Sequence, residues 1–141
     1  MSEPNPAPFV WQVRVYYEDT DAGAVVYHSR YLNMFERART EWLRAHGIGQ
    51  AALAREHGLL FAIRRVDVEF IQPARLDDVL DVSVELAAMG AARMEIRQQM
   101  TRQGDGELLA TADVTAACLT ADRFQPTRVP AWIRAEINNA E

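Results

Sequence analysis

Four apolar runs with a period of two follow one another after Gly58, with short turns between them. A side chain at every second position of a strand points to the same face of its sheet. The positions that share a face are Arg64, Val66, Val68 and Phe70; Leu80, Val82, Val84 and Leu86; Met94, Ile96, Gln98 and Met100; and Leu108, Ala110, Ala112, Val114, Ala116 and Cys118. Pro73 is expected to end the first run. Turns at Gly90 and at 103–106 join the last three, so we predict an antiparallel meander.

A helical pattern precedes these strands. From Arg30 to His46 apolar residues recur every three or four positions, which predicts a long helix with one apolar stripe. The stripe consists of Tyr31, Met34, Phe35, Ala38, Trp42 and Ala45. Ser29 is the expected N-cap and Gly47 the expected C-terminal stop. A second, short helix is predicted over Gly49–His57.

In the segment before the long helix, residues that would face the core alternate with residues that would face solvent over Phe9–Tyr17. This pattern predicts a further strand, with Val13, Val15 and Tyr17 on one face. A loop is expected over Glu18–Ala24, in which Gly23 can take backbone angles that other residues avoid.

These elements predict an α+β fold, with about five antiparallel strands curled round one central helix. The small side chains of residues 108–118 indicate that the long helix approaches that strand closely. We expect a single domain over residues 1–141, in which 1–8 form a flexible N-terminal arm. Residues 121–141 form a C-terminal tail with a short helix over 127–137. An open sheet leaves edge strands, and dimerisation would cover them.

Composition excludes several classes of protein. The chain of 141 residues has a net charge of -5 and a sequence pI near 5.2, which argues against general nucleic-acid binding. Its single cysteine, Cys118, excludes an internal disulfide and a multi-cysteine metal site, and its position predicts a buried, inert thiol. No apolar run approaches membrane-spanning length. We expect a soluble cytoplasmic protein, with a peripheral place at the inner face of the membrane as the alternative.

An acidic loop concentrates the reactive side chains of the chain. Asp21 stands just before a glycine-bearing turn that leads to a helix start, where unpaired backbone N–H groups can polarise a substrate carbonyl. A carboxylate there could attack that carbonyl or activate a water, and His28 could orient the water or move a proton. Asp19 could instead cap local backbone groups within a solvated turn. No further acidic cluster supports magnesium at this loop, so no metal site is predicted.

The same loop carries a specific resemblance. The run Tyr16-Tyr17-Glu18-Asp19-Thr20-Asp21-Ala22-Gly23, with Val25-Val26-Tyr27-His28 and Tyr31 after it, resembles the signature of the hot-dog-fold acyl-CoA thioesterases. Within them it resembles the Tol-Pal-associated, YbgC-type branch, which is related to hydroxybenzoyl-CoA thioesterase. The runs 35–41 and 70–80 also resemble that branch.

The resemblance implies hydrolysis of short- or medium-chain acyl-CoA without a metal or organic cofactor. It places the catalytic carboxylate on Asp21, a second catalytic group on His28, a site-lining tyrosine on Tyr17, and the oxyanion donor on a backbone N–H near His28. Ala24 stands where the family commonly has glycine. Substrate contacts are expected from Tyr27, Tyr31 and, for the phosphates of CoA, the arginines Arg64, Arg65 and Arg75.

The resemblance further implies a homodimer or homotetramer with sites at the subunit boundary, and acyl carrier protein as an alternative carrier of the substrate. Two other functions stay open. One is a hot-dog hydratase or dehydratase, although Asp21 before the helix favours the thioesterase. The other is a non-catalytic acyl-CoA sensor or an adaptor of a cell-envelope complex.

Overall fold

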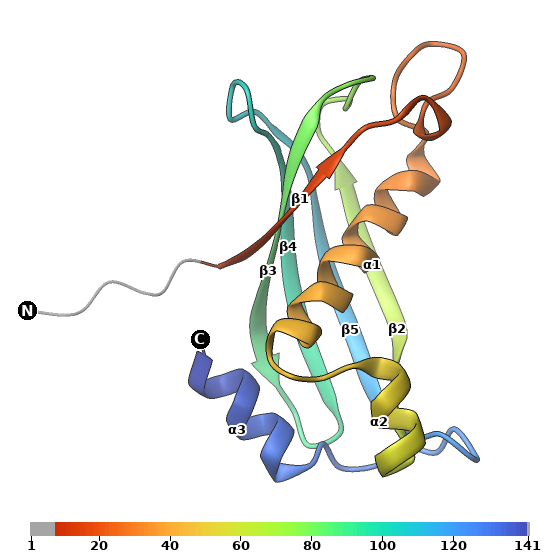
Figure 1. Ribbon diagram of the computed structural model, residues 1–141, viewed down its shortest axis with the longest axis vertical. Helices are drawn as coiled ribbons and strands as arrows, with labels where there is room; N and C mark the ends of the chain where they lie inside the picture. Colours follow the sequence, from red (N-terminus) through yellow and green to blue (C-terminus); the bar gives the residue numbers. More distant parts are fainter. Residues whose placement is uncertain (1–7, 141) are drawn as a thin grey trace, which may run out of the picture.

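An antiparallel sheet of five strands frames the molecule in the computed structural model, which describes residues 8–140 (Figure 1). The strands are β1 (Phe9–Arg14), β2 (Leu59–Phe70), β3 (Val79–Met89), β4 (Arg93–Arg102) and β5 (Leu108–Thr120). Their order across the sheet is β1-β3-β4-β5-β2. The predicted meander is therefore confirmed as β3-β4-β5, and β1 and β2 are the two edges. The arm predicted for residues 1–8 lies, except for Pro8, outside the described residues.

The long helix α1 (His28–Ala45) crosses the inner face of this sheet (Figure 1). It begins at His28 rather than Arg30, because Tyr27 and not Ser29 is the N-cap residue, and the Arg30 N–H donates to the Tyr27 carbonyl at 2.9 Å. Gly47 has φ +78° and its N–H donates to the Arg44 carbonyl, which confirms it as the stop.

Two shorter helices, α2 (Gln50–His57) and α3 (Ala131–Ala140), lie at the opposite end of the molecule from the start of α1 (Figure 1). The C-terminal helix begins directly after Pro130, later than the predicted 127, and buries Ile133 and Ile137. Among the described residues, no helix is long and apolar enough to cross a membrane.

The core lies between α1 and the inner face of β1, β3, β4 and β5. From α1 it contains Tyr31, Met34, Phe35, Ala38, Trp42 and Leu43. Ala45, predicted as part of the stripe, is exposed because it is the last residue of the helix. The backbone of α1 runs closest to β3 and β1. The strand β5 is not among these close neighbours, so the expectation that α1 closely approaches the small residues of β5 is wrong.

A β-bulge in β2 changes which of its residues face inward. The pairing with β5 shifts between Ile63 and Arg65, so Arg64 is the extra residue. Before and after the bulge, the apolar residues of β2 stand opposite residues of β5 that face inward. These residues of β2 are Phe61, Ile63, Val66, Val68 and Phe70. Residues opposite each other share a face of the sheet. The predicted face of Arg64, Val66, Val68 and Phe70 is thus wrong at Arg64, because simple alternation does not allow for an inserted residue.

The first strand is also shorter than predicted. It ends at Arg14, the Val15 N–H donates to the Asp78 carbonyl, and a short 3-10 helix η1 (Tyr17–Asp19) follows. Val13 and Val15 face the core as predicted, whereas Tyr17 has 82% of its surface exposed. The chain turns away from the sheet at this point and enters the acidic loop.

Candidate active site

Asp19 holds the acidic loop together. Its side chain is largely buried, and Oδ2 accepts a hydrogen bond from the Tyr16 N–H at 2.9 Å. Its backbone carbonyl accepts one from the Tyr27 N–H, also at 2.9 Å. These bonds join the entry to the loop with the residue before α1. The prediction that Asp19 caps local backbone groups is confirmed, but its side chain is buried and not part of a solvated turn.

Asp21 projects from the turn that follows. Its side chain is exposed, and Oδ1 accepts a hydrogen bond from the Gly23 N–H at 2.8 Å. Its backbone carbonyl accepts the Ala24 N–H at 3.1 Å, and its own N–H donates to the Val25 carbonyl at 3.0 Å. The turn therefore fixes the backbone of Asp21 and one carboxylate oxygen. Within the described residues, no hydrogen bond engages Oδ2.

The backbone conformation of this turn differs from the expectation. Ala24 has φ +62°, in the left-handed region, whereas Gly23 does not have a positive φ. A side chain with a Cβ is strained in that region by about 1–2 kcal/mol. The unusual angle that was expected at Gly23 thus lies one residue later, on an alanine.

His28 is the first residue of α1 and is exposed. Its ring lies against that of Tyr27, with centroids 4.2 Å apart and planes at 45°. The first N–H groups of a helix have no partner within the helix. No group in the described part of the chain accepts a hydrogen bond from the backbone N–H of His28 or Ser29. These donors remain available to a substrate oxygen beside the Asp21 turn.

The three tyrosines expected at the site lie in different surroundings. Tyr17 and Tyr27 are exposed near the loop. Tyr31 is buried, and its hydroxyl accepts a hydrogen bond from the Ala74 N–H at 2.9 Å. Its ring packs edge-to-face with that of Phe70, with the centroids 5.1 Å apart. The hydroxyl of Tyr31 thus ties the segment after β2 to α1, while its role in substrate binding stays a prediction.

The three expected arginines are all exposed, but only one lies near the loop. Arg75 pairs by a β-bridge with Val25, and its N–H donates to Asp78 Oδ2. Arg64 and Arg65 lie at the β2 bulge, five or more residues before Phe70 and so about 17–20 Å from the end of the strand near Tyr31. The structure brings Asp21, His28, Tyr27 and Arg75 to one end and leaves those two arginines elsewhere on this chain.

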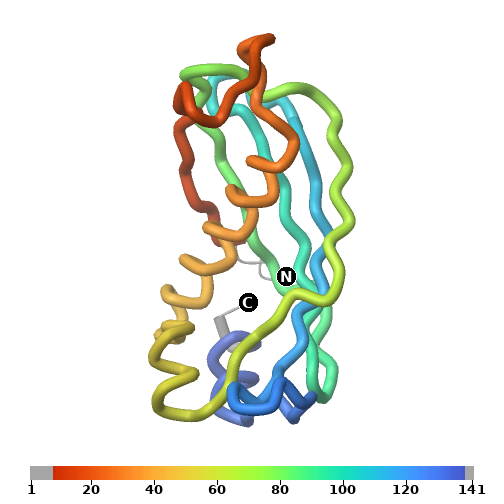
Figure 2. Tube along the Cα trace, turned by 90° about the vertical axis from the view of Figure 1, so that its right-hand side faces the viewer, coloured from red at the N-terminus to blue at the C-terminus, as the bar shows by residue number. Residues whose placement is uncertain are grey.

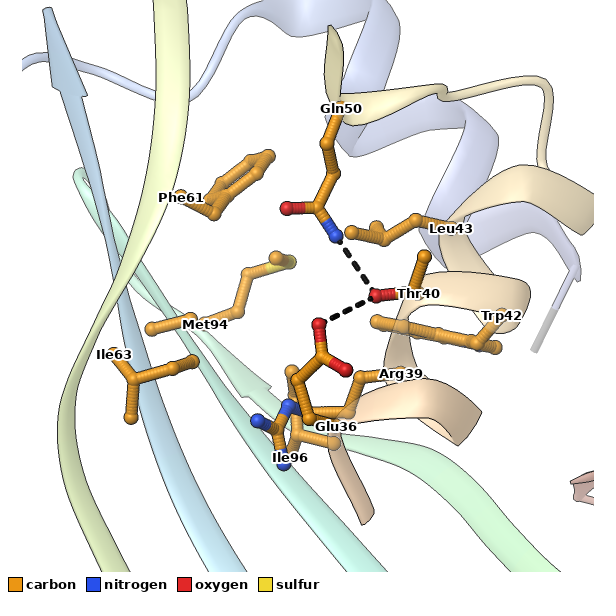
Figure 3. Close-up of a pocket in the computed structure, with 11 residues that line it drawn as sticks. Glu36, Arg39, Thr40, Trp42, Leu43, Gln50, Phe61, Ile63, Met94 and Ile96 are labelled. Atoms are coloured by element: carbon orange, nitrogen blue, oxygen red, sulfur yellow. Dashed lines mark hydrogen bonds between the residues drawn. The ribbon is translucent and has the colours of Figure 1, made fainter. Parts of the chain in front are cut away.

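Sequence reasoning missed a cleft farther along α1 (Figure 3). Its volume is about 190 Å³. Polar and apolar side chains of the helices α1 and α2 line one wall, and apolar side chains of the strands line the other. The lining residues are Glu36, Arg39, Thr40, Trp42, Leu43, Gln50, Phe61, Ile63, Met94, Ile96 and Ala116.

Arg39 is the buried cation of this cleft, with 8% of its surface exposed. Its Nη1 donates to Gln98 Oε1 at 3.0 Å, and Gln98 Nε2 donates to the Phe35 carbonyl at 3.0 Å. Burial lowers the pKa of the Arg39 guanidinium, and the nearby carboxylate of Glu36 raises that pKa by less. The sequence signal that could have revealed a buried polar pair here was Gln98, a polar residue at a position predicted to face inward.

The described residues include no group of three or more histidine, cysteine, aspartate or glutamate side chains that could hold a metal ion. Cys118 is buried, as expected, and burial raises the pKa of its thiol. The predicted absence of a cofactor stays a prediction.

Known proteins resemble this chain over nearly its whole length. It matches the Thioesterase-like superfamily over residues 15–137. It is 42% identical over 132 residues to the acyl-CoA thioester hydrolase YbgC of Escherichia coli O6:H1, covering 94% of this chain and 97% of that protein. These likenesses confirm the resemblance that the loop motif indicated.

Solved structures agree with this result. A probable thioesterase of Bartonella henselae is 35% identical, with a TM-score of 0.82, over 88% of this chain and 100% of that one. The 1,4-dihydroxy-2-naphthoyl-CoA thioesterase of Synechocystis is 22% identical, with a TM-score of 0.87, over 94% and 97% of the two chains. The second likeness extends to the hot-dog fold alone.

Proposed function

The chain belongs to the thioesterase-like superfamily, and we propose that it hydrolyses short- or medium-chain acyl-CoA thioesters to the free acid and CoA. One observation carries the proposal. The exposed carboxylate of Asp21 stands in a fixed turn beside a helix start whose first N–H groups have no partner among the described residues. Acyl transfer needs this pair of features, a base or nucleophile and donors for the oxyanion.

In the proposed mechanism, the thioester carbonyl oxygen accepts hydrogen bonds from the backbone N–H groups at the start of α1. One such donor contributes about 3 kcal/mol to stabilising the transition state. The free oxygen of Asp21 either takes a proton from the attacking water or attacks the carbonyl itself, and His28 orients the water or carries the proton. Trapping with hydroxylamine separates the two routes when the protein itself is analysed, because only direct attack forms an anhydride on Asp21, and only that anhydride can leave a hydroxamate on this side chain.

A thiol-release assay over a panel of acyl-CoA substrates tests this function. Asp21→Asn should lower kcat/KM by about a hundredfold or more, as expected for the loss of a general base or nucleophile. Glu18→Gln is the matched control, since it removes an exposed acid of the same loop and should leave the rate nearly unchanged. Cys118 is buried and should not contribute to the signal of the folded protein. Wild-type rates in a folded Asp21→Asn protein would refute the mechanism.

We also propose that the protein forms a homodimer, or a tetramer built from such dimers, through the edge of β2. This strand is long, pairs on one side with no other strand of the described residues, and carries the exposed apolar residues Ile63, Val66 and Phe70. A long exposed edge of this kind favours pairing with another strand. Val66→Arg should raise the monomer fraction in light scattering. Val10→Arg on the other edge strand should not, and the reverse result would place the contact at β1.

Carrier-protein thioesters, the cytoplasmic location and a role beside the Tol-Pal envelope complex remain predictions from the resemblance. The same assay with acyl carrier protein in place of CoA tests the first of them. No turnover of any thioester by the wild type would favour the adaptor over the enzyme.

A further inference from the structure

Residues 73–78 lie in the connection between β2 and β3, and we call them the 73–78 segment. In Figure 2 this green segment crosses the same end of the molecule as the orange-red acidic loop. The Val26 N–H donates to the Ala74 carbonyl at 2.8 Å. Val25 pairs with the same segment by a β-bridge, and its carbonyl accepts the Asp21 N–H at 3.0 Å. The segment is therefore joined through Val25 to the backbone of the candidate base.

Each side of this contact contains a non-glycine residue in the left-handed region. Ala24 in the acidic loop has φ +62°, and Asp77 in the 73–78 segment has φ +69°. The Leu76 N–H donates to the Ala24 carbonyl at 3.4 Å. The Asp77 N–H donates to the carbonyl of Val15 at 3.1 Å. Strained backbone persists only where the surrounding contacts hold it. The conformation of the loop therefore depends on its contacts with the segment.

Arg102, the last residue of β4, fixes the 73–78 segment at both ends. Its Nη2 donates to the Pro73 carbonyl at 3.0 Å, and its Nε donates to Asp78 Oδ2, also at 3.0 Å. The side chains of Arg102 and Asp78 are 22% and 19% exposed, so water screens this ion pair less than an exposed one. The remaining donor, Nη1, reaches Asp105 Oδ2 at 2.9 Å, outside the segment. The planar guanidinium makes all these bonds at once.

The start of α1, which carries the donors for the oxyanion, is held in another way. The helix buries Met34, Phe35 and Ala38 in the core. Loss of Arg102 should therefore leave the helix start in place and let the acidic loop shift against it. A reacting group that is misplaced by about 1 Å can lower a rate about a hundredfold.

We propose that Arg102 is a positioning residue for the hydrolytic reaction. By holding the 73–78 segment, it sets the position of the Asp21 carboxylate relative to the start of α1. Arg102 lies far from the loop motif in the sequence and acts without touching the substrate. This inference rests on the proposed thioesterase function.

The first test separates the chemical step from substrate binding. Arg102→Met removes the contacts with the segment and should lower kcat by about tenfold, while KM changes by less than about threefold. Arg97→Met is the matched control, because Arg97 also lies on β4 and pairs with a carboxylate, but that carboxylate belongs to Asp113 of β5. A wild-type kcat in folded Arg102→Met would overturn the inference, and so would an equal fall in Arg97→Met or a change in KM alone.

The two carboxylate partners of Arg102 give a second comparison. Asp78→Asn weakens the contact with the segment and should lower kcat several-fold. Asp105→Asn alters the contact on the other side of the same guanidinium and should keep kcat within about twofold. Both substitutions preserve the size of the side chain, so this pair decides the inference if Arg102→Met does not fold. Equal effects would mean that Arg102 acts through the turn after β4, and the inference would be wrong.

A double-mutant cycle tests whether Arg102 acts through Asp21. In an Asp21→Asn background the carboxylate is already absent, so the addition of Arg102→Met should lower the residual rate by less than about twofold. A general loss of structure would instead lower the rate by the same factor in both backgrounds. That result would overturn the inference.

Amide hydrogen exchange tests the contact independently of turnover. In Arg102→Met the N–H groups of Asp21 and Val26 should exchange about tenfold faster, whereas those of Phe35 and Ala38 in α1 should not. Arg97→Met should change none of them. If the wild type hydrolyses no thioester, the proposed function fails, and this measurement still decides whether Arg102 holds the acidic loop. Unchanged exchange at Asp21 and Val26 would refute that role.

Discussion

The two flanks of α1 face the same sheet but are packed very differently. The backbone of α1 runs closest to β3 and β1, its residues Met34 and Ala38 are buried, and Val82 and Val84 of β3 are fully buried. Toward β2 the corresponding side chains stay exposed, with Leu32 on the helix and Phe70 on the strand. The helix thus lies over one side of the sheet and leaves the other side open.

This asymmetry means that the two flanks contribute unequally to the stability of the fold. Apolar surface buried on the closed flank stabilises the fold, since each fully buried large side chain contributes about 1.5–3 kcal/mol. The open flank forgoes that contribution and leaves Leu32 and Phe70 exposed.

The largest expected difference is in the unfolding free energy lost when a buried and an exposed residue of α1, similar in size, are each replaced by alanine. Met34 has 2% of its surface exposed, and Met34→Ala should cost about 2–5 kcal/mol of unfolding free energy. Leu32→Ala, on the open flank, should cost less than about 1 kcal/mol because little buried surface is lost. Urea unfolding of both variants measures the difference. Equal losses would mean that the open flank is closed in solution.

The next effect concerns Tyr31, whose hydroxyl ties the start of α1 to the segment after β2. Tyr31→Phe removes the acceptor for the Ala74 N–H and leaves that buried group without a partner. The expected cost is about 1–3 kcal/mol, measured by thermal or urea unfolding. Tyr27→Phe is the control, because its side chain is exposed, and it should change stability by less than about 0.5 kcal/mol. An unchanged Tyr31→Phe protein would show that water replaces the hydroxyl.

Periodicity predicted the closed flank because its signals are local. Alternation located β3, β4 and β5, and the three- and four-residue spacing located α1, since each pattern follows from the geometry of one element. The acidic loop was recognised from a contiguous motif. These features need no knowledge of which elements meet in space.

The open flank could not be predicted in the same way. The bulge at Arg64 depends on the register between β2 and β5, although the change of apolar parity from Ile63 to Val66 was a visible sign of it. The pairing of Arg39 with Gln98 joins residues 59 positions apart, and a helix pattern alone does not reveal it. The sideways shift of α1 toward β1 and β3 is likewise a property of the assembled fold.

The smallest expected effect concerns the turn that carries the chain from β1 to the start of α1. Ala24 has φ +62°, which costs an alanine about 1–2 kcal/mol relative to its preferred regions. Ala24→Gly relieves that strain but loses conformational entropy on folding, so we expect a net stabilisation of about 0.5–1 kcal/mol. Differential scanning calorimetry measures it, and a loss of stability would show that the alanine methyl makes a contact that outweighs the strain.

Gly23→Ala changes the neighbouring residue of the same turn and should have the opposite profile. It should lower activity and leave stability nearly unchanged. Gly23 does not have a positive φ, so an added Cβ is not strained by the backbone, but it would lie 3.3 Å from Asp21 Oδ1. The carboxylate must then shift by a few tenths of an ångström, away from the position that the Gly23 N–H now fixes. We expect kcat/KM to fall several-fold while the unfolding free energy changes by less than about 0.5 kcal/mol. An unchanged kcat/KM would mean that the Asp21 carboxylate does not need this fixed position to react, and the role of the turn would then be structural.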